Sequence, residues 1–350
     1  MTDPYEQLFL PPSWLDIPFE PHSGLSSGTL QTVSGHLSNR AKVPNHEKVM
    51  VELPGGDALF VETDHHDLGN KAPVVMLFHG LGGCSRSPYM LSISWLLARH
   101  GIKTARFNHR GCGPGGRKLA KEIYHSGRRL DMILALETVA RKFSSSPVFA
   151  VGFSLSANML LNIAGERSNG VWPYNSSLLN KTPSKNIESF LSVCPPLDLD
   201  KCSLKLTRLL AKPFDLYFAL KLRKEIQTLV SEHRVETPSL NGIFGVRTFD
   251  EKVTAQLSGY PTAADYYRDN SSIYRLADVK TDVTVLASED DSVVDTSDYR
   301  VLSDYPNIST YLTKNGGHMG YLHRQVLPSS DKRWMDYFVL KWLKDRLSTV

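Results

Sequence analysis

The sequence predicts an α/β protein with a mostly parallel central sheet, helices packed on that sheet, and an inserted helical cap. Short apolar runs alternate with helical patterns along most of the chain. The runs lack the polar alternation of a strand with one wet face, which indicates a sheet buried on both sides. The alternation breaks at 195–279, which we assign to the cap. The core is therefore expected at 46–194 and 280–350.

The first 45 residues are rich in Pro, Ser, Gly and His and show weak periodicity. We expect 1–45 to form an irregular arm that lies over the surface. Two strands are expected next, at 49–53 and 58–62, because two apolar-rich runs flank the Pro-Gly-Gly-Asp turn of 54–57.

The remaining core elements follow from apolar runs and from helical periodicity. Strands are expected at 74–78, 102–107, 148–152, 190–194, 283–287 and 308–313. Helices are expected at 89–99, 129–142, 156–163 and 330–347.

Composition argues against several classes of protein. The chain is 41% hydrophobic and 22% charged, as in an ordinary soluble domain, and its net charge of +4 is too mild for a nucleic-acid-binding protein. The four cysteines form no Cys-x-x-Cys pair, so we expect free thiols, no metal site and no organic cofactor. We see no signal peptide and no apolar segment of roughly 18 residues, and therefore expect a cytoplasmic protein.

The most informative motif is Gly152-Phe-Ser154-Leu-Ser156, which follows an apolar run and precedes a run of helix formers. A strand, a sharp turn and a helix in this order are typical of a nucleophile elbow, which exposes its serine above the sheet. Glycine is needed at 152 because the turn leaves no room for a side chain. The motif usually ends in glycine, and Ser156 departs from it with a small side chain.

A second serine matches the full Gly-x-Ser-x-Gly pattern. It is Ser26, in Gly24-Leu-Ser26-Ser-Gly28. We expect no strand before it and no helix after it, so the surroundings of a nucleophile elbow are missing.

A serine hydroxyl needs a base, and the base needs a group that orients it. On a sheet of this kind the order along the chain is serine, acid, histidine. The candidate acid is Asp291, just beyond the strand at 283–287, with Asp290 as the alternative. The candidate base is His318, in a glycine-rich loop after the next strand.

Acyl transfer also needs two backbone N–H donors for the oxyanion. Leu155, directly after the serine, is one expected donor, and Leu81 in the loop His79-Gly-Leu-Gly-Gly83 is the other. His79 precedes the serine, and we expect it to hold this loop in shape. The run from Gly111 to Gly116 fits a dinucleotide pattern, but Pro114 would stiffen it and no clean helix opens there, so we expect a loop that lines the site.

In chain order, these motifs resemble those of the YheT-type branch of the α/β-hydrolases. The resemblance rests on Phe19-Glu-Pro, Gln31-Thr32, His79-Gly-Leu-Gly-Gly83, Asn108-His-Arg-Gly-Cys-Gly113, Tyr124-His-Ser-Gly127, Gly152-Phe-Ser-Leu-Ser-Ala-Asn158 and Gly316-Gly-His-Met-Gly320. It implies the α/β-hydrolase fold and a Ser154–Asp291–His318 hydrolase of carboxyl esters. Some relatives act on phospholipids, and others transfer acyl groups to alcohols. His79, Tyr124 and His125 are expected to line the pocket.

The leading hypothesis is thus a serine esterase that acts on a small ester or a lipid. An acyltransferase and a catalytically silent binding module remain open as alternatives. The basic segment 204–213 of the cap has an apolar stripe with cationic edges. It is expected either to pack onto the core or to attach to an anionic membrane surface.

Overall fold

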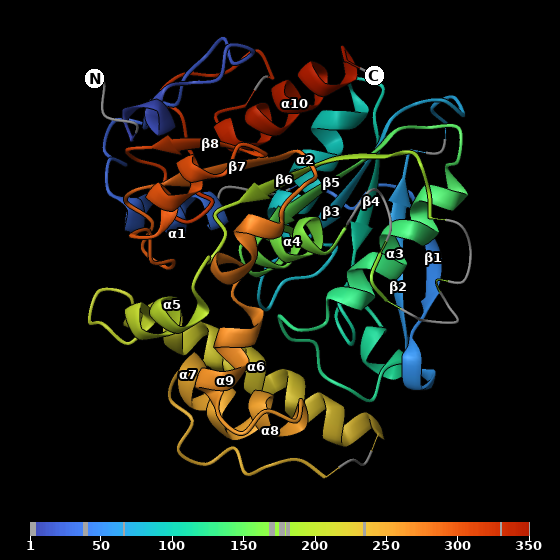
Figure 1. The fold of residues 1–350 in the computed structure, drawn as a ribbon, viewed down its shortest axis with the longest axis vertical. Coiled ribbons are helices and arrows are strands. Elements are labelled where there is room, and N and C mark those ends of the chain that lie inside the picture. The colour runs from blue at the N-terminus through green and yellow to red at the C-terminus, as the bar shows by residue number, and fades with distance from the viewer. Residues whose placement is uncertain are drawn as a thin grey trace.

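The computed structural model describes residues 5–37, 41–65, 67–167, 172–174, 179, 183–233, 236–329 and 331–349. One sheet in the order β1-β2-β4-β3-β5-β6-β7-β8 runs through the molecule (Figure 1). Its strands are β1 (His46–Glu52), β2 (Ala58–Asp64), β3 (Val74–Phe78), β4 (Lys103–Phe107), β5 (Val148–Phe153), β6 (Ile187–Val193), β7 (Val283–Ser288) and β8 (Ile308–Thr313). β2 pairs antiparallel with β1 and with β4, and the other pairs are parallel. The predicted fold class is confirmed.

Two hydrophobic cores lie on opposite faces of this sheet. Val74, Met76 and Phe78 of β3 belong to one core, while Val75 and Leu77 belong to the other. The first core includes residues of α3 (Arg129–Lys142) and α4 (Leu155–Glu166), and the second includes residues of α2 (Pro88–Ala98) and α10 (Trp334–Leu347). Both sides of each central strand are therefore dry, which explains the unbroken apolar runs in the sequence.

The segment between β6 and β7 forms a group of helices beyond the ends of the strands, at the bottom of Figure 1. Its helices are α5 (Leu199–Leu206), α6 (Lys212–His233), α7 (Val246–Phe249), α8 (Ala255–Leu257) and α9 (Ala263–Asn270), with a π-helical turn at Asp250–Thr254. Within the described residues, no helix combines the length and apolar character needed to cross a bilayer.

The expectation of an irregular arm at 1–45 is wrong in part. Residues Glu6–Phe9 form a 3-10 turn and Gly28–Leu37 form helix α1. The helix escapes a search for apolar periodicity because its only two buried residues are Gly28 and Gln31. Its place in the fold depends on polar contacts, described below.

The closing helix begins at Trp334 rather than at 330. The backbone before it pairs with another strand-like segment: His323 N donates to Lys332 O at 2.8 Å, and Trp334 N donates to Tyr321 O at 2.9 Å. These bonds hold 332–333 in an extended conformation, so the first helical turn cannot start there.

Candidate active site

Ser154 lies at the sharp turn between β5 and α4. Its backbone adopts φ 53° and ψ −119°, which only a few non-glycine residues tolerate and which is typical of a strained functional turn. Glycine is required at 152, because a Cβ there would lie 2.7 Å from the carbonyl oxygen of Ser156. The close approach of strand and helix thus dictates the Gly-x-Ser sequence.

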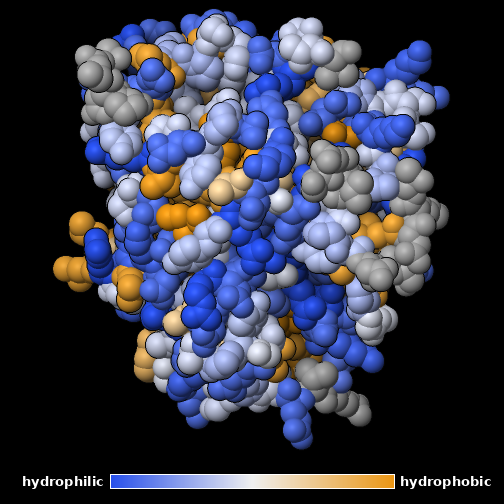
Figure 2. Space-filling model, viewed as in Figure 1, coloured by the Kyte–Doolittle hydropathy of each residue, from blue (hydrophilic) through white to orange (hydrophobic). Residues whose placement is uncertain are grey.

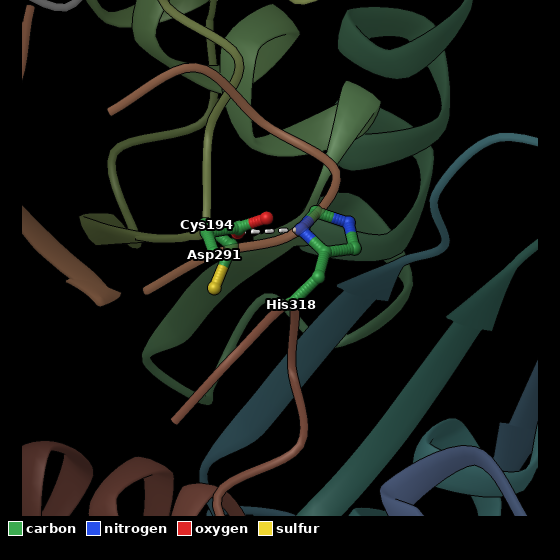
Figure 3. Close-up of side chains that lie close together, drawn as sticks. All are labelled: Cys194, Asp291 and His318. Atoms are coloured by element: carbon green, nitrogen blue, oxygen red, sulfur yellow. Dashed lines mark hydrogen bonds and ion pairs between the residues drawn. The ribbon is translucent and has the colours of Figure 1, made fainter. Parts of the chain in front are cut away.

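The structure brings together the three residues that sequence order selects. His318 Nε2 lies 2.8 Å from Ser154 Oγ, and His318 Nδ1 lies 2.7 Å from Asp291 Oδ2. Figure 3 shows the imidazole between two loops, with one ring nitrogen bonded to the carboxylate and the other directed away from it. The second carboxylate oxygen of Asp291 accepts the N–H groups of Val293 and Val294, both at 2.8 Å. The ring is therefore aligned by a carboxylate that is itself held on both oxygens.

Asp290, the alternative acid, has a different set of contacts. Its Oδ1 accepts the N–H of Gly317 at 2.8 Å, on the loop that carries the histidine. Of these two carboxylates, that of Asp291 bonds the His318 ring, and that of Asp290 supports the loop.

A cysteine lies beside this pair. The ligand atoms of Cys194, Asp291 and His318 all lie within 4.8 Å of one another, as Figure 3 shows. Burial raises the pKa of the Cys194 thiol far above its usual range, so the sulfur stays protonated and is a weak ligand for a metal.

Two backbone N–H groups in the cavity wall beside Ser154 have no acceptor among the described residues. Gly80 N donates to Tyr89 Oη at 3.0 Å and Gly82 N donates to Tyr124 Oη at 2.6 Å, whereas Leu81 N, between them, has no acceptor among the described residues. The N–H of Leu155 likewise has no acceptor there. A Cβ on Gly80 would lie 2.9 Å from Ser154 Cβ, so glycine is needed for this loop to approach the serine.

Ser156 connects this loop to the elbow. Its hydroxyl donates to the carbonyl oxygen of His79 at 2.5 Å and lies 2.7 Å from His109 Nε2. Since the hydroxyl proton is used on His79, His109 Nε2 must be the donor of the second bond. Burial lowers the pKa of the His109 ring well below its usual value, consistent with a neutral ring that carries one proton. The departure from glycine at 156 thus supplies a link that glycine cannot make.

His79 holds its own loop, as its position before the serine suggests. Its Nδ1 lies 2.8 Å from Gly80 O, and its Nε2 accepts the N–H of His109 at 3.2 Å. Burial lowers the pKa of His79 to about 4, so the ring stays neutral and can serve as donor at one nitrogen and acceptor at the other.

The role of α1 at the site escaped sequence reasoning. Thr32 Oγ1 accepts the backbone N–H of His318 at 2.8 Å, and Gln31 bonds both the N–H and the carbonyl of Leu322. These contacts anchor the two ends of the loop that carries the base. The Gln31-Thr32 pair in the family resemblance was the available signal, but nothing in the pair indicates which loop it contacts.

Two cavities meet at Ser154. The inner cavity, with a volume of about 100 Å³, lies under the cap and is lined by Leu81, Leu155 and mostly apolar cap residues. Tyr124 and His125 line it as well, whereas the fully buried His79 lines neither cavity at Ser154, contrary to expectation. The outer cavity, with a volume of about 350 Å³, lies on the His318 side and is lined by residues of α1 and α6. There is therefore space for part of a bound molecule on each side of the Ser154 side chain.

The inner cavity contains a few titratable groups. Burial raises the pKa of Glu225 to about 7 and that of Asp250 to about 6, so both carboxyls hold their protons more tightly than usual. Asp250 accepts hydrogen bonds from Thr254 and Tyr267, at 2.6 and 2.8 Å. Burial lowers the pKa of His125 to about 3, which keeps its ring neutral.

The two competing motifs have other roles. The exposed Ser26 has no strand before it, although α1 does begin at Gly28, so the expectation that no helix follows is wrong. In the 111–116 loop, a Cβ on Gly111 would lie 2.3 Å from the Arg117 guanidinium, and a Cβ on Gly113 would lie 2.2 Å from the Asn108 side chain. Its glycines thus make room for packed side chains, and the loop lines neither cavity at Ser154, contrary to expectation.

Known proteins share both sequence and fold with this chain. Residues 73–325 match the family described as alpha/beta hydrolase fold. The Escherichia coli (strain K12) protein YheT is 26% identical over 93% of this chain and 92% of its own length. The Saccharomyces cerevisiae medium-chain fatty acid ethyl ester synthase/esterase 2 is 26% identical over 76% of this chain, which spans 62% of that longer protein. The solved structure of the Pyrococcus furiosus esterase Pf2001 superposes with a TM-score of 0.54 over 89% of this chain and 93% of its own, at 16% identity, and so supports the fold alone. The resemblance to the YheT-type branch is confirmed, and the chain belongs to the α/β-hydrolase family.

Proposed function

We propose that this α/β-hydrolase cleaves carboxylic esters through an acyl-enzyme on Ser154. The observation that carries the proposal is the bonded series Ser154 Oγ, His318 and Asp291, with contacts of 2.8 and 2.7 Å. A neutral imidazole at hydrogen-bond distance from a serine hydroxyl can take its proton, and a carboxylate on the opposite nitrogen stabilises the imidazolium that forms.

In the first half of the reaction, Ser154 Oγ attacks the ester carbonyl carbon while its proton passes to His318 Nε2. The carbonyl oxygen becomes negative, and the unoccupied N–H groups of Leu81 and Leu155 are available to hold it. The C–O bond to the alcohol then breaks, and the leaving oxygen takes the proton from His318.

In the second half, water replaces the alcohol. His318 accepts a proton from the water as its oxygen attacks the acyl-serine carbonyl. Collapse of the second oxyanion releases the carboxylic acid and returns the proton to Ser154. No group outside the chain and its substrates is needed for the balance of protons.

The two cavities suggest which part of the ester lies where. The leaving alcohol must take its proton from His318, and His318 lines the outer cavity and not the inner one. The acyl chain would then occupy the inner cavity beside Leu81 and Leu155. Its apolar lining favours a hydrocarbon acyl group, of short to medium length or from a lipid.

Labelling with a fluorescent fluorophosphonate tests the proposal, since this probe reacts with activated serines. We expect the wild type to be labelled, the Ser154→Ala variant to be unlabelled, and the matched Ser26→Ala control to be labelled like the wild type. Labelling that survives in Ser154→Ala would contradict the assignment. An unlabelled wild-type protein would favour the silent binding module.

Acyl transfer to an alcohol is the second candidate, because the name of the similar yeast protein includes both ester synthase and esterase. The outer cavity could hold an acceptor alcohol as well as a leaving one. Product ratios in dilute ethanol separate the two reactions: mainly free acid supports hydrolysis, and mainly ethyl ester supports transfer.

A further inference from the structure

The exposed apolar side chains of this protein are concentrated on one face. Of the nineteen large hydrophobic residues with exposed side chains in the described ranges, nine lie on α1 or within 204–220. We call α1 together with 204–220 the docking face. A cluster of this kind on a protein surface marks a site of association.

The most exposed residues of the docking face form a tip. Leu209 and Leu210, in the turn between α5 and α6, are 87% and 84% exposed. Figure 2 shows hydrophobic side chains that project at the left edge of the molecule, where Figure 1 places this turn. Within 204–213, Leu206 and Ala211 are buried against the core. The segment therefore packs on the core with one side and presents leucines with the other.

The apolar surface continues along two helices. Leu216 and Leu220, one turn apart on the outer side of α6, are 48% and 57% exposed. Across from them, Val33 and Leu37 of α1 are 41% and 72% exposed. The two helices are neighbours, since the rings of His36 and Tyr217 lie 6.2 Å apart.

Positive charge surrounds these side chains. Residues 201–224 contain seven Lys and Arg residues and one acidic residue, Asp215, although the whole chain carries only +4. Arg208, beside the tip, and Lys224, on α6, make no side-chain hydrogen bond or ion pair with any described residue. Lys212, by contrast, pairs with Asp215 at 2.8 Å. Protruding leucines with unpaired cations at their edge match the headgroup layer of an anionic membrane.

The outer cavity leads from this face to the nucleophile. It is lined by Val33, Leu37 and Tyr217 at one end and by Ser154 and His318 at the other. A hydrocarbon chain or lipid ester that leaves the bilayer at the docking face would therefore meet apolar surface as far as the reacting hydroxyl.

We propose that the docking face binds the surface of an anionic phospholipid bilayer, with Leu209 and Leu210 inserted among the headgroups. Only the route of the lipid to Ser154 rests on the proposed function. Binding itself is measured without turnover, so the failure of one proposal is distinguishable from the failure of the other.

Vesicle flotation tests the surface. The probes are vesicles of phosphatidylcholine alone and of equimolar phosphatidylcholine and phosphatidylglycerol, at low salt. We expect the wild type to float with the mixed vesicles and to be released by high salt. Because the Leu209→Ser/Leu210→Ser variant loses the burial of two leucine side chains among the headgroups, it should bind on the order of 100-fold more weakly, or weaker still. The matched control is Val326→Ser, which removes an equally apolar side chain that is 64% exposed elsewhere.

Each other result overturns the proposal. Equal flotation of the leucine variant and the wild type would exclude insertion of the tip, and equal binding to both vesicles would exclude recognition of anionic lipid. Failure of the wild type to float, with a dimer in light scattering that the leucine variant loses, would mean that a second copy of the chain covers this face.

Activity supplies an independent readout, because neither leucine lines a cavity at Ser154. We expect the leucine variant to keep the wild-type kcat/KM on a short water-soluble ester and to lose rate on an ester carried in mixed vesicles. A parallel loss on both esters would indicate damage to the site rather than loss of docking.

Discussion

Replacement of Ser156 by alanine should loosen the candidate oxyanion hole without touching the reacting groups. The change removes one hydroxyl, which donates to His79 O at 2.5 Å and accepts from His109 Nε2 at 2.7 Å. Both partners are buried. The variant therefore leaves one acceptor and one donor unsatisfied in the interior.

The expected loss of stability follows from these two groups. A buried polar group without its partner costs about 1–3 kcal/mol, so the pair sets a range of about 2–6 kcal/mol. A change of tautomer does not rescue His109, since its Nδ1 also has no partner among the described residues. We expect the loss of stability to lie in the lower half of this range, because the change to alanine removes only one oxygen atom and so leaves only a small cavity.

The expected loss of rate is smaller than that for removal of an oxyanion donor. Complete loss of one donor costs about 10²–10³-fold in kcat. Tyr89 and Tyr124 still hold the N–H groups of Gly80 and Gly82 on either side of Leu81, so the donor is displaced rather than lost. We expect kcat to fall about tenfold.

The assay combines urea unfolding, kcat on a soluble ester and the affinity of a boronic acid, whose tetrahedral adduct places an oxygen in the hole. The matched control is Ser146→Ala, which removes a buried hydroxyl bonded to Asn70 O at 2.9 Å near the start of β5. The control should lose about 0.5–1.5 kcal/mol and keep both kcat and boronate affinity. If Ser156→Ala loses stability but keeps the wild-type kcat and boronate affinity, then the inferred role of Ser156 in positioning the oxyanion loop is wrong.

Asp291→Asn should lower kcat by about 10⁴-fold, as expected for removal of the group that orients the base, whereas the amide of Asp290→Asn can still accept from Gly317 and should leave kcat within tenfold. Steady-state kinetics on one ester compare the two, and equal losses would count against the choice of Asp291. Thr32→Val keeps the shape of the side chain but removes the acceptor of the His318 N–H, and kcat should fall about tenfold with little change in KM. An unchanged kcat would show that α1 does not hold the base. Glu225 has a raised pKa of about 7, so it is neutral below that pH and negative above it; KM for an apolar acyl ester should rise as the pH passes 7, and Glu225→Gln should abolish the rise. A rise in KM that persists in the variant would exclude this carboxyl as its cause.

The core of the fold was predictable because its strands are dry on both faces. Val74–Phe78, which is buried at every position, was predicted to the residue. Ile308–Thr313 was also predicted to the residue, although Ser309 of this edge strand is exposed. The start of α10 was not, because it depends on hydrogen bonds between Tyr321 and Trp334 and between His323 and Lys332. Such pairings between distant segments leave no periodic trace in the sequence.

At the site, the order along the chain was enough to select Ser154, Asp291 and His318, because the order of the strands in the sheet determines which loops lie side by side. The supporting contacts were different. Nothing near Thr32 in the sequence indicates that its hydroxyl accepts the N–H of a residue 286 positions away. The hydrogen bond from Ser156 to the carbonyl oxygen of His79, 77 positions away, could not be predicted either. In the sequence, Ser156 is recognisable only as a departure from the usual glycine.

The hydrogen bond from His318 to Thr32 joins two segments that lie 286 positions apart in the sequence, so this part of the site forms only when both are present. During synthesis the elbow and the neighbouring strands β3 and β6 emerge before the loop that carries His318. We expect Ser154 to be unreactive in a nascent chain that ends before His318, because the base is then absent. In refolding, recovery of serine labelling would mark the last step of assembly and should lag behind recovery of tryptophan fluorescence.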